Sequence, residues 1–159
     1  MRIAIISDSH HAVDTVKKLL NHLRETGIKH LIHAGDFIGY KVESVFADFP
    51  DIQSWIARGN CDSRGSTLDY LNGLDHVVVS DLLRFSIDGV SFIVGHIPGS
   101  ALNAYNKEPA DIIIHGHTHL PRIESYQDAL LLNPGSLMEG DGYMLLELPD
   151  LTVNRHFNF

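Results

Sequence analysis

Side chains able to bind metal ions recur along this chain in five short polar clusters, each directly after an apolar run. The runs are rich in β-branched residues and end at Gly or Asp, which is typical of buried strands. In open α/β sheets, ligands bind beyond the carboxyl ends of the strands. If the five strands share one sheet edge, we expect enough carboxylate, amide and imidazole groups there for two metal ions. These groups belong to Asp8, His10, Asp36, Asn60, His96, His117 and His119.

The spacing within two of the clusters indicates how an ion would be held. Asp8 and His10 are two positions apart, and residues i and i+2 of an extended backbone point the same way, so both would face one ion. The same reasoning applies to His117 and His119. Imidazole combined with carboxylate suits Mn, Fe, Co, Ni or Zn, whereas a purely oxygen site would suit Mg or Ca. The Asp36 carboxylate has two oxygens and could bridge two metals.

Each cluster also has an ordinary structural explanation when it is taken alone. An Asp-Ser pair is a favourable helix N-cap, and Gly-Asp and Gly-Asn are common turn dipeptides. His33 and His115 precede two of the clusters, and we interpret them as strand-end histidines with backbone partners that could act behind the metal ligands. The order of all five clusters, each at a strand end, favours a metal site over five unrelated turns.

Length, composition and charge limit the classes of protein to which this chain could belong. The 159 residues, 44% of them hydrophobic, suit one domain spanning 1–159. No apolar stretch approaches the roughly 20 residues of a membrane helix, the N-terminal apolar run is too short for a signal peptide, and Cys61 is the single cysteine, so we expect a cytoplasmic protein. A net charge of −8 without a run of Lys or Arg argues against an extended nucleic-acid footprint. A small anionic substrate and a homo-oligomer stay open.

The elements that must position the clusters follow from the hydrophobic pattern. Strands at 1–6, 28–34 and 52–58 alternate with helices at 11–26 and 42–49, which Gly27 and Pro50 end, so the first strands should be parallel. An Asp88-Gly89 turn predicts a hairpin, and the segments after residue 121 predict an antiparallel tail. About ten strands with three or four helices would split into two packed sheets. We therefore predict an α/β fold, a four-layer α/β/β/α sandwich of two mixed sheets flanked by helices.

The ordered motifs Asp-x-His, Gly-Asp, Gly-Asn-x-Asp, Gly-His and Gly-His-x-His, from residue 8 to 119, resemble those of the calcineurin-like metallophosphoesterase superfamily. The chain length, the Gly-Asn-Cys-Asp variant and the Asn-Pro-Gly-Ser segment at 133–136 are similar to the small single-domain YfcE-type phosphodiesterase branch. The resemblance implies one ion held by Asp8, His10, Asp36 and His119. It implies a second ion, bridged by Asp36 and held also by Asn60, His96 and His117.

The resemblance also implies the same sandwich, two divalent ions with Mn favoured over Fe, Zn, Co or Ni, and a small or nucleotide-like phosphodiester substrate. Water activated by the metal pair would attack phosphorus, with Asp36, Asn60 and His96 as the catalytic residues. Many members of the superfamily carry His after Gly-Asn, where this chain has Cys61. A thiol with a pKa of about 8.5 is a poor general acid, so we predict a preference for phosphodiesters with good leaving groups.

Alternatives stay open for both the residues and the function. Cys61 could be a small buried packing residue, and Asn133 is expected to be structural. We interpret His11, Asp62 and Arg64 as loop residues that could also reach the substrate. A non-enzymatic protein-interaction scaffold, as in a retromer subunit that resembles this fold, is one alternative function, although all seven positions carry competent donors. A phosphomonoesterase or a nuclease is another, against which Cys61 and the acidic charge argue respectively.

Overall fold

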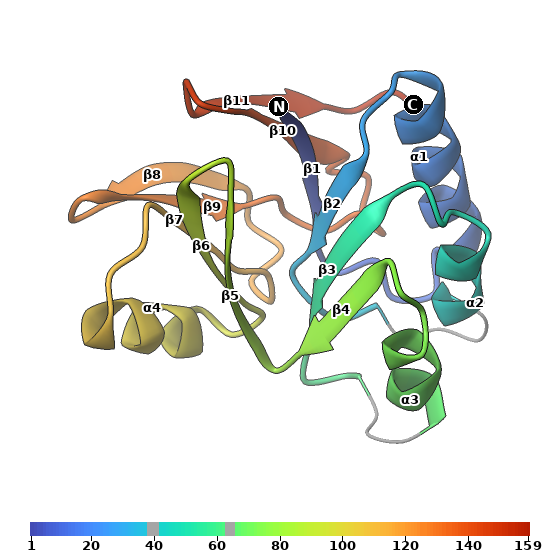
Figure 1. The fold of residues 1–159 in the computed structure, drawn as a ribbon, viewed down its shortest axis with the longest axis horizontal. Coiled ribbons are helices and arrows are strands. Elements are labelled where there is room, and N and C mark those ends of the chain that lie inside the picture. Colours follow the sequence, from blue (N-terminus) through green and yellow to red (C-terminus); the bar gives the residue numbers. More distant parts are fainter. Residues whose placement is uncertain (38–41, 63–65) are drawn as a thin grey trace.

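The computed structural model describes residues 1–37, 42–62 and 66–159, and strands and helices alternate through the first half (Figure 1). This half contains β1 (Arg2–Ile6), α1 (Val13–Glu25), β2 (His30–His33), α2 (Val42–Ala47), β3 (Gln53–Ala57), α3 (Ser66–Asn72) and β4 (Val77–Ser80). The second half contains β5 (Leu82–Ile87), β6 (Val90–Gly95), α4 (Pro98–Lys107), β7 (Ile112–Ile114), β8 (Arg122–Tyr126), β9 (Ala129–Asn133), β10 (Tyr143–Glu147) and β11 (Thr152–His156).

The strands form two mixed sheets. The first has the order β11-β10-β1-β2-β3-β4, with β1 to β4 parallel and β10 and β11 antiparallel to their neighbours. The second has the order β5-β6-β7-β9-β8, in which β6, β7 and β9 are parallel. The parallel pairing of β7 with β9 corrects the expectation of a wholly antiparallel tail. It arises because the chain crosses from β7 to the sheet edge at β8 and returns beside β7.

Helices cover the two outer faces of the paired sheets. In Figure 1, α1, α2 and α3 lie along the first sheet and α4 lies against the second, which confirms the predicted four-layer sandwich. Three apolar layers separate the four structural layers. Strand β1 shows how one segment serves two of them, because successive side chains of a strand point to opposite faces. Ala4 and Ile6 pack toward the helices, whereas Ile3 and Ile5 pack between the sheets.

The turns behave as their sequences predict. Gly27 follows α1 with a φ of +71°, and the N–H of Ile28 donates to the Leu23 carbonyl at 2.8 Å, which ends the helix with a Schellman-type pattern. Asp88 and Gly89 both have positive φ and join β5 to β6 in a tight hairpin. Local backbone chemistry therefore accounts for where these elements stop.

The five polar clusters follow β1, β2 and β3 of the first sheet and β6 and β7 of the second. The expectation of one shared sheet edge is therefore wrong. The carboxyl ends of the parallel strands in both sheets point to one end of the sandwich instead, and hydrogen bonds join them there. Nδ1 of His96 donates to the Ala34 carbonyl at 2.8 Å, and the N–H of His117 donates to Oδ2 of Asp8 at 3.0 Å.

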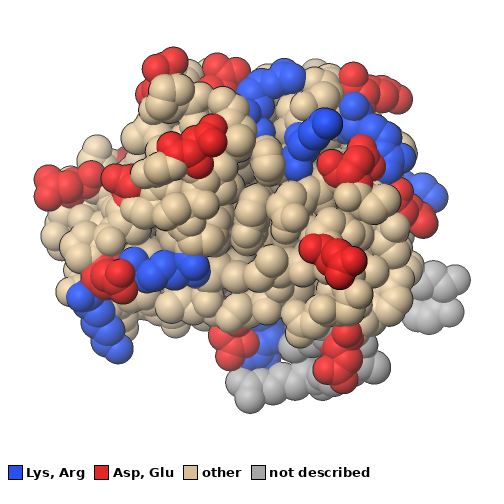
Figure 2. Space-filling model, in the orientation of Figure 1, with Lys and Arg blue, Asp and Glu red and all other residues tan. Residues whose placement is uncertain are grey.

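Charged side chains are dispersed on the face that Figure 2 shows, where Lys and Arg alternate with Asp and Glu among uncharged surface. None of the four described helices has the length and apolar character needed to cross a bilayer.

Candidate metal centre

The loops that carry the predicted ligands have an unusual backbone. Asp8, His10, Asp36, His117 and His119 all have φ between 41° and 69°. This left-handed conformation costs on the order of 1 to 3 kcal/mol for a residue other than Gly, and such strain gathers at functional sites. The extended backbone that we assumed for the two residue pairs is therefore wrong, because each pair lies in a tightly turning loop.

Glycine allows the loops of the two sheets to approach one another. Gly35 has a φ of +96°, and a Cβ atom there would lie 2.6 Å from Nδ1 of His96. A Cβ atom at Gly59 would overlap the Asp36 carboxylate. These two positions of the Gly-Asp and Gly-Asn motifs must lack a side chain for the ligand groups to meet.

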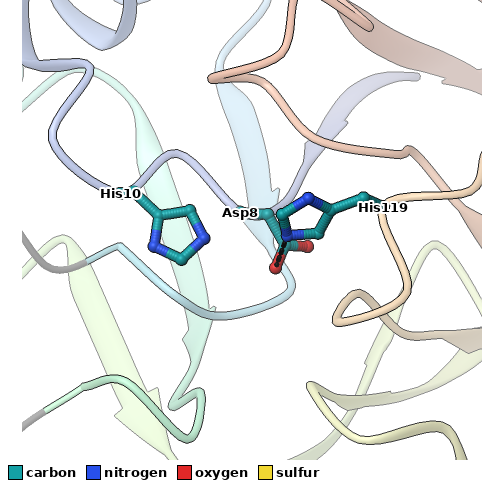
Figure 3. Close-up of side chains that lie close together, drawn as sticks. All are labelled: Asp8, His10 and His119. Carbon is teal, nitrogen blue, oxygen red and sulfur yellow. Dashed lines mark ion pairs between the residues drawn. The ribbon is translucent and has the colours of Figure 1, made fainter.

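The first cluster consists of Asp8, His10 and His119 (Figure 3). Nε2 of His119 lies 3.2 Å from Oδ1 of Asp8, and Nδ1 of His119 donates to Oε1 of Glu139 at 2.7 Å. The ring of His10 lies beside that of His119, with centroids 5.7 Å apart. Oδ1 of Asp8 is buried and accepts no hydrogen bond from the described residues, so this oxygen is available to a cation.

The second cluster consists of Asp36, Asn60 and His96. Nε2 of His96 lies 3.3 Å from Oδ2 of Asp36 and 3.1 Å from Oδ1 of Asn60. The other carboxylate oxygen of Asp36 accepts the backbone N–H of Cys61 at 2.9 Å. Oδ2 of Asp36 also lies 3.9 Å from Nε2 of His10, so this carboxylate lies between the two clusters.

The donor set fits divalent metal ions. His96 and His119 both donate through Nδ1, so Nε2 of each neutral ring offers a lone pair. Each Nε2 faces oxygens that also offer lone pairs, and this contact is repulsive unless a proton or a metal ion lies between the atoms. Two ligands that are each about 2.1 Å from one ion lie about 3.0 to 3.4 Å apart. The observed separations of 3.1 to 3.3 Å fall in that range.

In the second cluster, Asp36 and His96 shift each other's pKa toward the charged forms, an anionic carboxylate and a cationic imidazole. Burial opposes the charge on Asp36, but hydrogen bonds from His96 and from the Cys61 N–H outweigh it and hold the pKa of Asp36 well below its usual value. Burial also lowers the pKa of His96, but Asp36 and the Ala34 carbonyl raise it more, so the net shift is upward. A proton on His96 therefore competes with a metal ion for the same lone pair.

The two histidines of the Gly-His-Thr-His segment lie at different clusters. The ring of His117 is exposed and lies beside His96, with centroids 5.2 Å apart, whereas His119 lies beside His10. The prediction that His117 and His119 face one ion is therefore wrong. Both residues have a left-handed backbone, so they do not follow the extended geometry that the prediction assumed.

Two carboxylates that support the clusters were not identified from the sequence. Asp62 is buried and accepts the backbone N–H groups of Asp36, Phe37 and Gly59 at 3.0, 2.9 and 2.6 Å, so it joins the loops after β2 and β3. Its place in the Gly-Asn-x-Asp motif was a signal, although we interpreted it as a loop residue. Glu139 lies 20 positions from His119, and no pattern in the sequence pointed to it.

The predicted supporting residues lie behind the ligands. His33 is buried, accepts the Gly35 N–H at Nδ1 and donates to Oγ of Ser9 at 2.8 Å, and burial lowers its pKa to about 3. The Asn133 side chain donates to Oγ1 of Thr118 at 2.8 Å and accepts the Gly135 N–H at 2.9 Å. Asn133 is therefore structural, as expected, and it holds the loop that carries His117 and His119.

Cys61 is exposed, so the alternative of a buried packing residue is wrong. Its Sγ atom lies within 4.8 Å of ligand atoms of both His10 and Asp36. His11 is exposed on the same loop as His10, and Arg64 lies outside the described residues. The seven predicted ligands thus gather at one end of the sandwich, while their role as ligands stays a prediction.

Comparison with known proteins identifies the family to which this chain is similar. Residues 1–150 match the calcineurin-like phosphoesterase superfamily domain. The chain is 28% identical over 141 residues to phosphodiesterase MJ0936 of Methanocaldococcus jannaschii, with 85% of this chain and 83% of that protein covered. It is 25% identical over 153 residues to phosphodiesterase YfcE of Escherichia coli K12, with 86% and 79% covered. The resemblance to YfcE-type phosphodiesterases is confirmed.

Solved structures share the fold. A structure described as a novel archaeal phosphodiesterase has a TM-score of 0.85 and 24% identity, and covers 98% of this chain and 99% of its own. A Vps29 from Entamoeba histolytica, solved with Zn²⁺, has a TM-score of 0.68 and 20% identity, and covers 96% and 89%. Names of the matched relatives include metallophosphoesterase, which implies divalent metal ions. With a family match over residues 1–150 and a site at the carboxyl ends of both sheets, this chain belongs to the calcineurin-like phosphoesterase superfamily.

Proposed function

We propose that this phosphoesterase is a metal-dependent phosphodiesterase that hydrolyses a small or nucleotide-like phosphodiester, within one domain spanning residues 1–159. One observation carries the proposal: in each cluster a histidine Nε2 lies 3.1 to 3.3 Å from carboxylate or amide oxygens, a separation that suits two ligands of one ion, and Asp36 lies between the clusters. Carboxylate and imidazole groups held this close attract positive charge, so the geometry suits a chain that holds cations there.

Each cluster would hold one ion. Asp8, His10 and His119 would share Asp36 with the second set, which Asn60, His96 and His117 complete. Divalent ions bound there would clamp phosphate oxygens and lower the pKa of a water molecule. The protein's own contribution is to keep Asp36 ionised and to orient the imidazoles, through the Ala34 carbonyl for His96 and Glu139 for His119. Mn is our first choice of metal, with Fe, Zn, Co or Ni compatible with the same donors.

The expected preference for substrates with good leaving groups comes from position 61. An imidazole there would help to protonate the leaving alkoxide, whereas the Cys61 thiol donates weakly. The Asp36 carboxylate beside it raises the pKa of Cys61 further, so the thiol releases its proton even less readily. Substrates whose leaving group needs no proton are therefore favoured, and alkyl monoesters should turn over slowly.

The test compares bis(p-nitrophenyl) phosphate with p-nitrophenyl phosphate. Protein stripped with a chelator is reloaded with Mn, Fe, Co, Ni or Zn, bound metal is counted, and release of p-nitrophenolate is followed. We expect two ions per chain and faster hydrolysis of the diester. Tight binding of metal with no hydrolysis of either ester would overturn the proposal. It would favour the second candidate, a protein-interaction scaffold, to which the shared fold of Vps29 lends support.

A further inference from the structure

A small pocket opens beside the second cluster and is not needed to hold metal. Its volume is about 190 Å³, and its wall includes Asn60 and His96. The remaining wall comes from Arg58 after β3, Asp81 between β4 and β5, and Ile97 and Ser100 at the start of α4. The pocket therefore lies where the two halves of the sandwich meet, adjacent to the predicted position of the phosphate.

The pocket has a charge pair on its wall. Nε of Arg58 lies 2.5 Å from Oδ1 of Asp81, and the backbone N–H of Arg58 donates to the Ser80 carbonyl at 2.8 Å. The Arg58 side chain is 16% exposed and the Asp81 side chain 64% exposed. Because the two charges neutralise each other, a charged group entering the pocket would have to compete with one partner for the other. The pocket is therefore suited to an uncharged group that can accept from a guanidinium or donate to a carboxylate.

The volume limits what can enter. Pockets for drug-sized ligands measure about 300 to 1,000 Å³. A volume of about 190 Å³ is below that range and suits one six-membered ring or a short polyol. A complete nucleoside is larger than that, so only part of one could lie within the pocket.

We propose that this pocket binds one ester arm of the substrate and selects a small, uncharged arm, such as a single ring or a short polyol. The inference rests on the proposed phosphodiesterase function, because it places the phosphorus at the metal clusters. Arg58, Asp81 and Ser100 then determine substrate specificity without holding the metal ions. Inorganic phosphate, which has no ester arm, would bind beside the pocket without entering it.

Substituting Ser100→Leu tests this arrangement by filling the pocket from α4. We expect the KM for bis(p-nitrophenyl) phosphate to rise about tenfold, as one lost contact of about 1.4 kcal/mol would give. The inhibition constant of inorganic phosphate should stay within about twofold. Asn103→Leu is the matched control, because Asn103 is exposed on the same helix and is not part of the pocket wall. An equal change in both constants, or no change in either, would overturn the inference.

A second variant tests the charge pair. Asp81→Asn leaves Arg58 without this counter-charge, so the pocket should then accept an anionic arm. We expect kcat/KM for bis(4-carboxyphenyl) phosphate to improve at least about threefold relative to bis(p-nitrophenyl) phosphate, and an unchanged ratio counts against the pocket. If the wild type hydrolyses no diester, the proposed function fails by itself. Calorimetric affinities of the wild type and Ser100→Leu for bis(p-nitrophenyl) phosphate would still decide whether the pocket binds an arm.

Discussion

The two clusters of the candidate metal centre differ in what orients their histidines. His96 is 2% exposed, and its Nδ1 donates to a backbone carbonyl at the end of β2. The His119 side chain is 28% exposed, and its Nδ1 donates to Glu139, whose side chain is 54% exposed. A backbone carbonyl in the sheet framework cannot move without disturbing the fold, whereas an exposed carboxylate can. The histidine of the second cluster is thus oriented by backbone where the two sheets meet, whereas the orientation of His119 in the first cluster depends on a surface side chain.

Loss of Asp36 should have the largest effect, because its Oδ2 atom approaches histidines of both clusters. In Asp36→Asn we expect metal-dependent hydrolysis of bis(p-nitrophenyl) phosphate to fall by at least 10² to 10³-fold, roughly the scale of a lost electrostatic group in an active site. Metal counting should show weakened binding at both sites. Circular dichroism should show a retained fold, because the amide can still accept the Cys61 N–H. Full activity in this variant would contradict the bridging position.

Loss of Glu139 should affect one cluster and spare the other. We expect Glu139→Ala to weaken one of two Mn²⁺ binding steps by about 10- to 100-fold, the usual cost of removing a carboxylate behind a ligating histidine. Isothermal titration calorimetry separates the two steps. Glu25→Ala, at an exposed position of α1, is the control. If both binding steps weaken together, Glu139 does not support the first cluster alone.

A substitution of Cys61, which lies near both His10 and Asp36, tests whether the thiol limits protonation of the leaving group. Cys61→His should raise kcat/KM for an alkyl monoester such as glycerol 2-phosphate by roughly tenfold or more, because it supplies a better proton donor to the alkoxide leaving group. Esters of p-nitrophenol, whose p-nitrophenolate already leaves readily, should gain less. A rate of phosphate release from the alkyl monoester that does not increase would show that the thiol does not limit protonation of the leaving group.

The smallest effect is expected far from both clusters, at Asp111. Hydrogen bonds from the hydroxyl and the N–H of Ser91, at 2.6 and 2.7 Å, lower the pKa of this exposed carboxyl group. A pKa lowered by folding stabilises the protein above the unfolded value of about 3.9, and this stabilisation is lost as the pH falls through the folded value.

Ser91→Ala should therefore lower the free energy of unfolding by less than about 1 kcal/mol at pH 6, because the pair is exposed to solvent. The difference from the wild type should shrink as the pH falls below about 4. Urea denaturation at pH 6 and pH 3 measures this difference in the free energy of unfolding, and a chelator removes any contribution from metal binding. A difference that grows in acid would reverse the sign of the assigned pKa shift.

The predicted helices, hairpin and layers agree with the structure because local rules decide them. Gly27 ends α1 through its own φ, and β1 is apolar on both faces because both are covered. The conformation of the ligand loops could not be predicted in this way. Asp8 and His119 have left-handed backbones, which are uncommon even for Asp and His, so tertiary contacts must help to hold them there.

Sequence alone determined the types of the candidate ligands, their order along the chain and the four-layer sandwich, because motif spacing and hydrophobic periodicity depend on residues that are close in the sequence. Tertiary structure decided which histidine lies at which cluster, that Asp62 and Glu139 support them, and that Arg58 and Ser100 share a pocket. The physical reason is distance along the chain. Glu139 and His119 are 20 residues apart, and Arg58 and Ser100 lie in different halves of the sandwich, so only packing of the two sheets brings them together.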